Sequence, residues 1–192
     1  MISAILLAAG QSKRMGELKQ LMPFGKSTIV EQAVDNLLGS VLDEVIVVVG
    51  YMAEDVTKAI AAKPVKLVIN PDYEQGMSTS IIAGLKSVHS GAQGVMLALG
   101  DQPLVDSQTI NGLIKEFYDH DKGISVPTYR GRKGHPIIFA IKYKEQLLEL
   151  SGDVGGKQII EDHTDDVLEV AVDSESIVAD FDTTGDYQAY VG

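Results

Sequence analysis

The sequence contains no cysteine. This absence excludes disulfide bonds, thiolate nucleophiles and zinc sites built on thiolates, and it favours a cytoplasmic location. The sequence also has no apolar run long enough to span a bilayer. The first apolar stretch, residues 2–7, has no basic residue before it, so we expect neither a signal peptide nor a membrane anchor.

Positive charge is also scarce. Sixteen Lys and Arg residues face 27 Asp and Glu residues, which gives a formal net charge of -11. Such an acidic chain is unsuited to nucleic acid or an anionic membrane surface as its main partner. An anionic ligand would have to be met by a local group of basic residues.

No low-complexity segment, internal repeat or linker divides the chain. A hydrophobic content of 45% and a charged content of 22% are ordinary for a globular protein. A chain of 192 residues can bury one sizeable core. We therefore expect residues 1–192 to form a single domain.

Hydrophobic patterning predicts the fold class. Short apolar runs rich in Val, Ile and Leu predict strands covered on both faces, at residues 2–7, 45–49, 65–69, 95–99, 124–126, 137–139 and 167–172. Helical spacing predicts helices between them, at residues 28–38, 53–62, 78–88, 107–118, 142–150 and up to about 163. This alternation predicts a Rossmann-like three-layer α/β/α sandwich with a mostly parallel mixed sheet of about seven strands.

The alternation loosens after residue 118. Pro127, the loop 131–134 and Pro136 join two short strands without a helix between them. Such a connection indicates a hairpin, and hence one antiparallel strand in the sheet.

The loop after the first strand is the main candidate site. Small residues at positions 8–10 leave backbone N–H groups free to bind phosphate oxygens. Lys13, Arg14 and Lys19 stand beside this loop, a local basic group in an acidic chain. We interpret it as a triphosphate site. The alternative is a surface turn whose basic side chains only offset the acidic charge of the protein.

Two familiar nucleotide signatures are absent. The sequence has no Gly-x-Gly, so the dinucleotide fingerprint is missing and hydride transfer loses its main support. Residues 25–28 resemble the end of a P-loop, but Gln20 occupies the position of the required glycine. We expect a turn there, with Ser27 or Thr28 capping the next helix.

Two aspartates are candidate magnesium ligands. Asp101 follows the strand 94–99 after a single residue, Gly100, and Mg²⁺ typically takes one or two protein carboxylates together with phosphate oxygens. The alternative is a helix N-cap, a role that Asp106 or Ser107 would fill better. Asp182 is the candidate for a second carboxylate, with the same alternative for a final helix.

The stretch 70–80 ends a strand with turn-forming residues and opens a helix with hydroxyl groups. These groups could contact a nucleotide base, or they could simply cap the helix. The four histidines show no metal-ligand spacing. Only His135, between Gly134 and Pro136, is a candidate for function.

Taken in order, these motifs resemble a known family. They are Leu-Ala-Ala-Gly-x-Ser-x-Arg-Met-Gly-x-x-Lys from residue 7, Gly-Met-Ser-x-Ser from 76, Gly-Asp-Gln-Pro from 100, Gly-His-Pro from 134, Gly-Asp-x-Gly from 152 and Asp-x-Asp-Thr from 180. The chain resembles nucleotidyltransferases with a glycosyltransferase-A-like fold, most closely their molybdenum cofactor cytidylyltransferase branch. The resemblance covers nearly the whole chain.

The resemblance implies a reaction. The terminal phosphate of molybdopterin would attack the α-phosphorus of CTP and release pyrophosphate, with Mg²⁺ as cofactor. A molybdoenzyme or its chaperone would be a further partner. Ala-Ala-Gly in the first loop, where guanylyltransferase relatives tend to have Ala-Gly-Gly, favours CTP over GTP. Three alternatives stay open: another acceptor such as a sugar 1-phosphate or methylerythritol phosphate, GTP as donor, or a non-catalytic chaperone that binds the nucleotide or cofactor.

The resemblance also implies roles for individual residues. Arg14, Lys19 and Asp101 would be catalytic, and Asp101 and Asp182 would hold the metal. The nucleotide would be bound by Leu7, Ala8, Ala9, Gly10, Ser12, Arg14, Lys19, Gly76, Met77, Ser78, Ser80 and Gly100. The acceptor would be bound by Gln102, Pro103, Gly134, His135, Asp153 and Lys157.

Two positions depart from the family pattern. Lys157 stands where the pattern has Arg, which retains the charge but loses a bidentate contact with phosphate. Thr184 and Gly185 stand where Pro-Glu usually follows. Both bear on the second substrate more than on the class of reaction.

Overall fold

The fold is described from a computed structural model, which covers residues 1–12, 18–179 and 187. The strands are β1 Ile2–Ala8, β2 Pro23–Phe24, β3 Ser27–Thr28, β4 Glu44–Val49, β5 Lys66–Ile69, β6 Gly94–Leu99, β7 Ile124–Tyr129, β8 Arg132–Lys133, β9 Ile137–Ala140 and β10 Val167–Ala171. The α-helices are α1 Ile29–Leu38, α2 Ala53–Ile60, α3 Met77–Leu85, α4 Ser107–Asp119, α5 Lys144–Leu148 and α6 Lys157–Asp162. Short 3-10 helices are η1 Lys19–Leu21, η2 Tyr73–Gln75, η3 Ile141–Tyr143, η4 Thr164–Asp166 and η5 Glu175–Val178.

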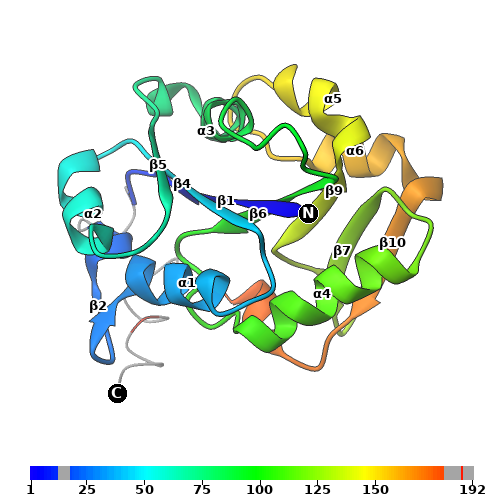
Figure 1. Ribbon diagram of the computed structural model, residues 1–192, viewed down its shortest axis with the longest axis horizontal. Helices are drawn as coiled ribbons and strands as arrows, with labels where there is room; N and C mark the ends of the chain where they lie inside the picture. Colours follow the sequence, from blue (N-terminus) through cyan, green and yellow to red (C-terminus); the bar gives the residue numbers. More distant parts are fainter. Residues whose placement is uncertain (13–17, 180–186, 188–192) are drawn as a thin grey trace.

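One mixed sheet forms the centre of the molecule, in the order β10-β7-β9-β6-β1-β4-β5 (Figure 1). β1 pairs in parallel with β4 and β6, whereas β9 runs antiparallel between β6 and β7. The short β8, which the sequence did not predict, forms a tight antiparallel hairpin with β7. The predicted mostly parallel sheet and its antiparallel strand are therefore confirmed.

Helices cover both faces of the sheet. α3, α5 and α6 lie on one face, and α1 and α4 lie on the other (Figure 1). Alternate residues of β1 supply the two cores, with Ala4 and Leu6 packed under α1 and α4, and Ile5 packed under α3. This alternation follows from the period of two along a strand. The three-layer sandwich is confirmed.

The outer strand β5 departs from the prediction. Its apolar run predicted a strand covered on both faces, but Leu67 is 37% exposed and Ile69 is 63% exposed. Within the described sheet, β5 is an edge strand that pairs with β4. The prediction of full coverage is wrong here because an apolar run does not reveal whether other elements pack over both faces of a strand at the edge of the sheet.

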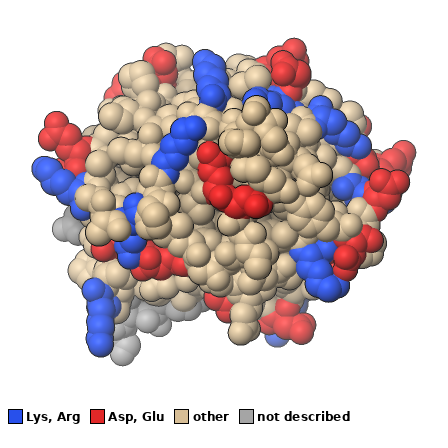
Figure 2. All heavy atoms as spheres, viewed as in Figure 1, with Lys and Arg blue, Asp and Glu red and all other residues tan. Residues whose placement is uncertain are grey.

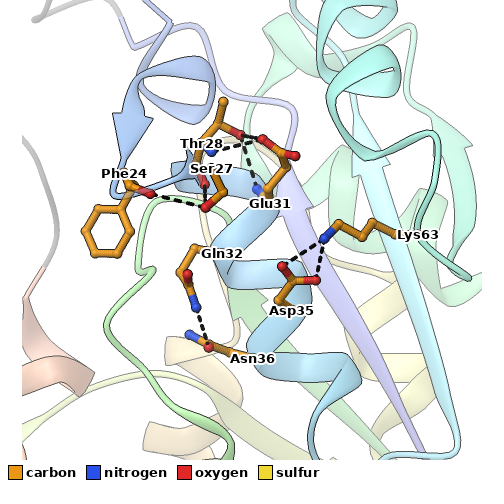
Figure 3. A network of polar contacts seen from close by, with 8 residues as sticks. All are labelled: Phe24, Ser27, Thr28, Glu31, Gln32, Asp35, Asn36 and Lys63. Atoms are coloured by element: carbon orange, nitrogen blue, oxygen red, sulfur yellow. Dashed lines mark hydrogen bonds and ion pairs between the residues drawn. The ribbon is translucent and has the colours of Figure 1, made fainter.

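The start of α1 confirms the predicted turn and cap. Gly25, with φ of 60°, connects β2 and β3. Thr28 then caps α1: its Oγ1 accepts from the N–H of Glu31 at 3.4 Å, and the Glu31 carboxylate accepts from the Thr28 N–H at 2.9 Å (Figure 3). This reciprocal pair is a capping box. Residues 25–28 thus form a turn, the short strand β3 and the N-cap of α1.

Asp166 lies at the centre of a polar cluster at the amino ends of β7 and β10. This cluster is at the opposite end of the strands from their carboxyl ends. The Asp166 carboxylate accepts from the Tyr143 hydroxyl at 2.5 Å and from the Gly123 N–H at 3.0 Å, and it pairs with Lys142 at 2.7 Å. Burial alone raises the pKa of the Asp166 carboxyl, but the hydrogen bonds from Lys142, Tyr143 and Gly123 outweigh it and lower this pKa to about 2. Burial, followed by the bond to Asp166, raises the pKa of Tyr143 to about 12.

This cluster predicts a pH dependence of stability. The folded pKa of Asp166 lies below the unfolded value of about 3.9, so its contribution is present above pH 4 and is lost as the pH falls from about 4 to 2. Tyr143→Phe removes one donor, and we expect it to cost about 1 kcal/mol at pH 7 and to raise the pKa of Asp166. Urea unfolding at pH 7 and pH 3, with NMR titration of Asp166, measures both effects. Identical titration of Asp166 in both proteins would contradict this account.

Charged side chains of both signs are interspersed on the face that Figure 2 shows, so the acidic excess is not gathered into one block there. Among the described residues, no helix is both long and apolar enough to cross a membrane.

Candidate active site

A cleft of about 540 Å³ opens at the carboxyl edge of the sheet. The pairing of Ala8 with Val49 and of Leu7 with Leu99 brings the ends of β1, β4 and β6 to this edge. Ligands of open α/β sheets bind at this edge. Of the predicted site residues, the cleft is lined by Leu7, Ala9, Gly10, Ser12, Gly76, Met77, Ser80, Asp101 and Asp153.

Ser12 organises the loop after β1. Its backbone adopts φ of 50°, in the left-handed region. The Ser12 hydroxyl accepts from the Lys19 N–H at 3.1 Å and donates to the Gln20 side chain at 3.3 Å. These bonds fix η1 against the loop. Arg14, Lys13 and Asp182 lie outside the described residues.

Lys19 and Asp101 form an ion pair beside the cleft. The Lys19 ammonium lies 3.3 Å from a carboxylate oxygen of Asp101, and Lys19 is only 7% exposed. Asp101 follows Gly100, whose N–H donates to the Leu7 carbonyl at 3.0 Å, and this bond holds the turn against the end of β1. The sheet thus brings together two predicted catalytic groups that are 82 residues apart.

The charged groups around the cleft suit an anionic ligand that carries a bound cation. The described lining of the cleft includes the carboxylates of Glu74, Asp101 and Asp153, and Lys19 lies behind Asp101. A free triphosphate would be repelled by these carboxylates, whereas a triphosphate carrying a divalent cation would be partly neutralised. Among the described residues, no group of three or more His, Cys, Asp or Glu side chains could hold a metal alone. Asp101 fits a metal whose remaining ligands are phosphate oxygens and water.

The segment 70–80 forms one wall of the cleft. Asn70 is buried, and its amide donates to the hydroxyls of Thr79 and Ser80, each at 2.9 Å. These bonds hold the first turn of α3 against the end of β5. Gly76 and Met77 face the cleft beside Ser80, whereas Ser78 lies behind this wall, 1% exposed.

Six lining residues were not among the predicted site residues: Gln11, Gln20, Tyr73, Glu74, Gln75 and Leu99. Tyr73 and Glu74 lie within the stretch 70–80, and their place directly after a strand was the available signal. Gln20 is buried beside Lys19, and no sequence pattern pointed to it. The side chain of Gln11 also bridges to Glu74 at 3.2 Å across the rim.

Most predicted acceptor residues lie outside this cleft, and Asp153 alone of them lines it. The Gln102 side chain, together with Pro136, lines a separate cavity of about 20 Å³ between α1 and α4. The Pro103 carbonyl accepts from the Asn36 amide at 2.8 Å.

The remaining predicted acceptor residues lie at two other points of the fold, the corner between β8 and β9 and the start of α6. The Gly134 N–H donates to the Pro127 carbonyl, and the His135 N–H donates to the Ile177 carbonyl, each at 2.9 Å. The Lys157 side chain is 86% exposed and lies 3.6 Å from Glu161. The described structure therefore does not gather these residues into one pocket.

Fold and site together define a Rossmann-like α/β protein with a polar cleft at the strand ends. A family model for the MobA-like NTP transferase domain matches residues 4–167. The chain belongs to this family and is a nucleotidyltransferase.

Similar proteins differ in their named activities. The nicotine blue oxidoreductase of Paenarthrobacter nicotinovorans is 31% identical over 166 residues, which cover 81% of this chain and 79% of that protein. The molybdenum cofactor cytidylyltransferase of Escherichia coli K12 is 29% identical over 189 residues, which cover 97% and 93%. Family membership therefore does not by itself select a substrate.

The structure is similar to that of Rv0371c from Mycobacterium tuberculosis H37Rv. The TM-score is 0.90 at 33% identity, and the match covers 99% of this chain and 96% of the other. A complex of Rv0371c with manganese matches with a TM-score of 0.85 at 30% identity, over 99% and 97% of the two chains. A divalent metal therefore binds to a protein of this fold.

Proposed function

We propose that this protein is a cytidylyltransferase that transfers CMP from CTP to the terminal phosphate of molybdopterin and releases pyrophosphate. The observation that carries the proposal is the Lys19–Asp101 ion pair, 3.3 Å apart, beside the small-residue loop that follows β1. The similarity to the Escherichia coli cytidylyltransferase along 97% of the chain supports this acceptor.

The reaction forms one bond and breaks one bond. An oxygen of the acceptor phosphate bonds to the α-phosphorus, and the bond from that phosphorus to the bridging oxygen of pyrophosphate breaks. Backbone N–H groups of the loop 8–12 would hold the phosphates. The Lys19 ammonium, with Arg14 beside the same loop, would stabilise the charge that develops on their oxygens.

Asp101 would hold Mg²⁺, with Asp182 as the second protein ligand. Bound there, Mg²⁺ would neutralise phosphate charge and orient the triphosphate. The lining described above fits such an ion because Asp101 faces the cleft and two further carboxylates add to the negative potential. Asp153 would border the acceptor.

The methyl group of Ala9 would favour cytosine, the smaller base, over guanine. Ala9 lines the cleft and packs so closely against Gly50 that a Cβ on Gly50 would lie 2.9 Å from the Ala9 Cβ. Ala9→Gly would enlarge the cleft by one methyl group. We expect the ratio of kcat/KM for CTP to that for GTP to fall about tenfold. Steady-state kinetics with both nucleotides measures this ratio.

Ala61→Gly is the matched control for this substitution. Ala61 is exposed at the end of α2, and we expect its variant to leave the CTP to GTP ratio unchanged. An unchanged ratio in Ala9→Gly would show that Ala9 does not select the base.

A pyrophosphate-release assay tests the proposed function as a whole. Purified protein is given each of the four nucleoside triphosphates with Mg²⁺ and, in separate reactions, molybdopterin, a sugar 1-phosphate or methylerythritol phosphate. We expect turnover only with molybdopterin, fastest with CTP. Turnover with a sugar phosphate but not with molybdopterin would refute the proposed acceptor. Nucleotide binding without turnover would favour a chaperone role instead.

A further inference from the structure

The first turn of α3 is bonded to a loop that lies far away in the sequence, between α5 and α6. The Ser78 hydroxyl donates to the Gly152 carbonyl at 2.7 Å, and the Ser78 N–H donates to the same oxygen at 3.3 Å. The Met77 N–H donates to a carboxylate oxygen of Asp153 at 3.2 Å. We call these three bonds the clasp.

The clasp supplies a cap that α3 lacks in its own sequence. The N-cap residue is Gly76, which has no side chain to accept from the first N–H groups of the helix. The Asp153 carboxylate, 76 residues away, takes this role and faces the positive end of the helix. One charged side chain therefore both caps α3 and lines the cleft.

The start of α3 and the loop 151–156 also contact each other through their backbones. Gly76 has φ of 113°, and a Cβ there would lie 2.5 Å from the Gly152 carbonyl carbon and 2.6 Å from the Asp153 nitrogen. Only glycine leaves room for this approach. The loop is thus seated directly on the wall of the cleft that Gly76 and Met77 form.

The loop has few internal constraints of its own. Residues 151–156 contain three glycines and lie outside any helix or strand. Glycine-rich backbone loses much conformational freedom on ordering, so bonds from outside must offset that cost. Ser78, buried to 99%, supplies two of the three bonds in the clasp.

We propose that Ser78 is a positioning residue for the acceptor side of the cleft, which it serves by fixing the loop 151–156 and the Asp153 carboxylate. The inference rests on the proposed transferase function. It assigns Ser78 a role other than contact with the nucleotide. Ser78 does not line the cleft, whereas Asp153, which the clasp fixes, does.

Apart from Gly76 and Met77, which the clasp contacts, the nucleotide side is held independently of the clasp. Ser12, Lys19 and Asp101 are positioned by bonds among themselves and to the end of β1. Asn70 fixes Ser80 and Thr79 from the side of β5. Loss of the Ser78 hydroxyl is therefore expected to affect the acceptor more than CTP.

Kinetics and hydrogen exchange of the full-length protein test the proposal. In Ser78→Ala, we expect the KM for molybdopterin to rise about tenfold, the Kd for CTP with Mg²⁺ to change less than twofold, and amide exchange to accelerate at residues 151–156. Ser78→Cys, with a similar size and a weak donor, should fall between wild type and Ser78→Ala. Ser87→Ala, in the turn that follows α3, is the matched control and should resemble wild type.

Each outcome decides a separate question. An active wild type with unchanged acceptor KM in both Ser78 variants would overturn the proposal. A general rise in exchange across α3 and the sheet would also overturn it, because it would indicate a purely structural role. If the wild type transfers nucleotide to no acceptor, the proposed function fails. Exchange at 151–156 then still tests the clasp, and an unchanged rate there would refute it.

Discussion

Asp101→Asn is expected to lower kcat for nucleotidyl transfer about a thousandfold while leaving the fold intact. Asn is nearly isosteric with Asp but carries no charge, so it would bind a divalent cation poorly and would no longer neutralise Lys19. Removal of one group that acts on the developing charge commonly costs two to three powers of ten, roughly 3–4 kcal/mol. Pyrophosphate release at saturating CTP and molybdopterin measures the loss.

Asp106→Asn is the matched control for this variant. Asp106 lies five residues further along the same connection, is exposed, and caps α4 through a 2.8 Å bond from the Thr109 N–H. Asn caps helices about as well as Asp, so we expect activity and melting temperature close to those of wild type. Undiminished turnover in Asp101→Asn would show that Asp101 neither holds the metal nor contributes to catalysis.

The dependence of the rate on metal concentration separates the two expected roles of Asp101, which are to bind the metal and to neutralise Lys19. Treatment with EDTA is expected to abolish transfer by the wild type, and titration with Mg²⁺ or Mn²⁺ should restore it. In Asp101→Asn, we expect the metal concentration for half-maximal rate to rise at least tenfold. An unchanged metal requirement together with lost activity would indicate that the carboxylate acts through Lys19 alone.

The position of Asp101 was predictable from the sequence because two simple rules apply to it. An apolar run of strand length identified β6, and parallel strands place their carboxyl ends at one edge of the sheet. The same reasoning placed the loop after β1 beside Asp101. The mostly parallel sheet with one antiparallel strand followed from the helical spacing and its interruption after residue 118, whereas the strand order was not predicted.

Contacts between distant loops were not predictable in this way. Ser78 and Gly152 are 74 residues apart, and neither lies in a pattern with a period that relates it to the other. Gly76 was visible only as one glycine of a motif, and its φ of 113° and contact with the loop at 152 emerge only from tertiary packing. The exposure of β5 escaped prediction for a similar reason, since hydrophobicity does not report a strand's place in the sheet.

The predicted acceptor residues illustrate a further limit. They were assigned from a resemblance between sequence motifs, and a sequence motif does not give the positions of its residues in space. Asp153 lines the cleft, whereas Gln102 lines a small cavity beside α1 and α4 and Lys157 is exposed beside Glu161. The acceptor site thus stays a prediction, and Asp153 is the residue from which to begin its mapping.

Lys19→Met is expected to lower kcat/KM for CTP at least a hundredfold. Met has a similar volume and suits the buried position of Lys19, so the fold should be retained, but the positive charge next to Asp101 is lost. The phosphate oxygens would then lose an ammonium group that helps to stabilise the transition state. Lys26→Met, an exposed lysine in the nearby turn, is the control and should retain wild-type kinetics.

The double variant tests whether Lys19 and Asp101 act as a unit. Suppose that the pair works together on one metal-bound triphosphate. The fold-loss of kcat/KM in the double variant, Lys19→Met with Asp101→Asn, should then be far smaller than the product of the fold-losses in the two single variants. A coupling energy above about 1 kcal/mol would support joint action. Strict additivity would mean that each group acts on a different part of the reaction, and the ion pair at 3.3 Å would then have no joint role in transfer.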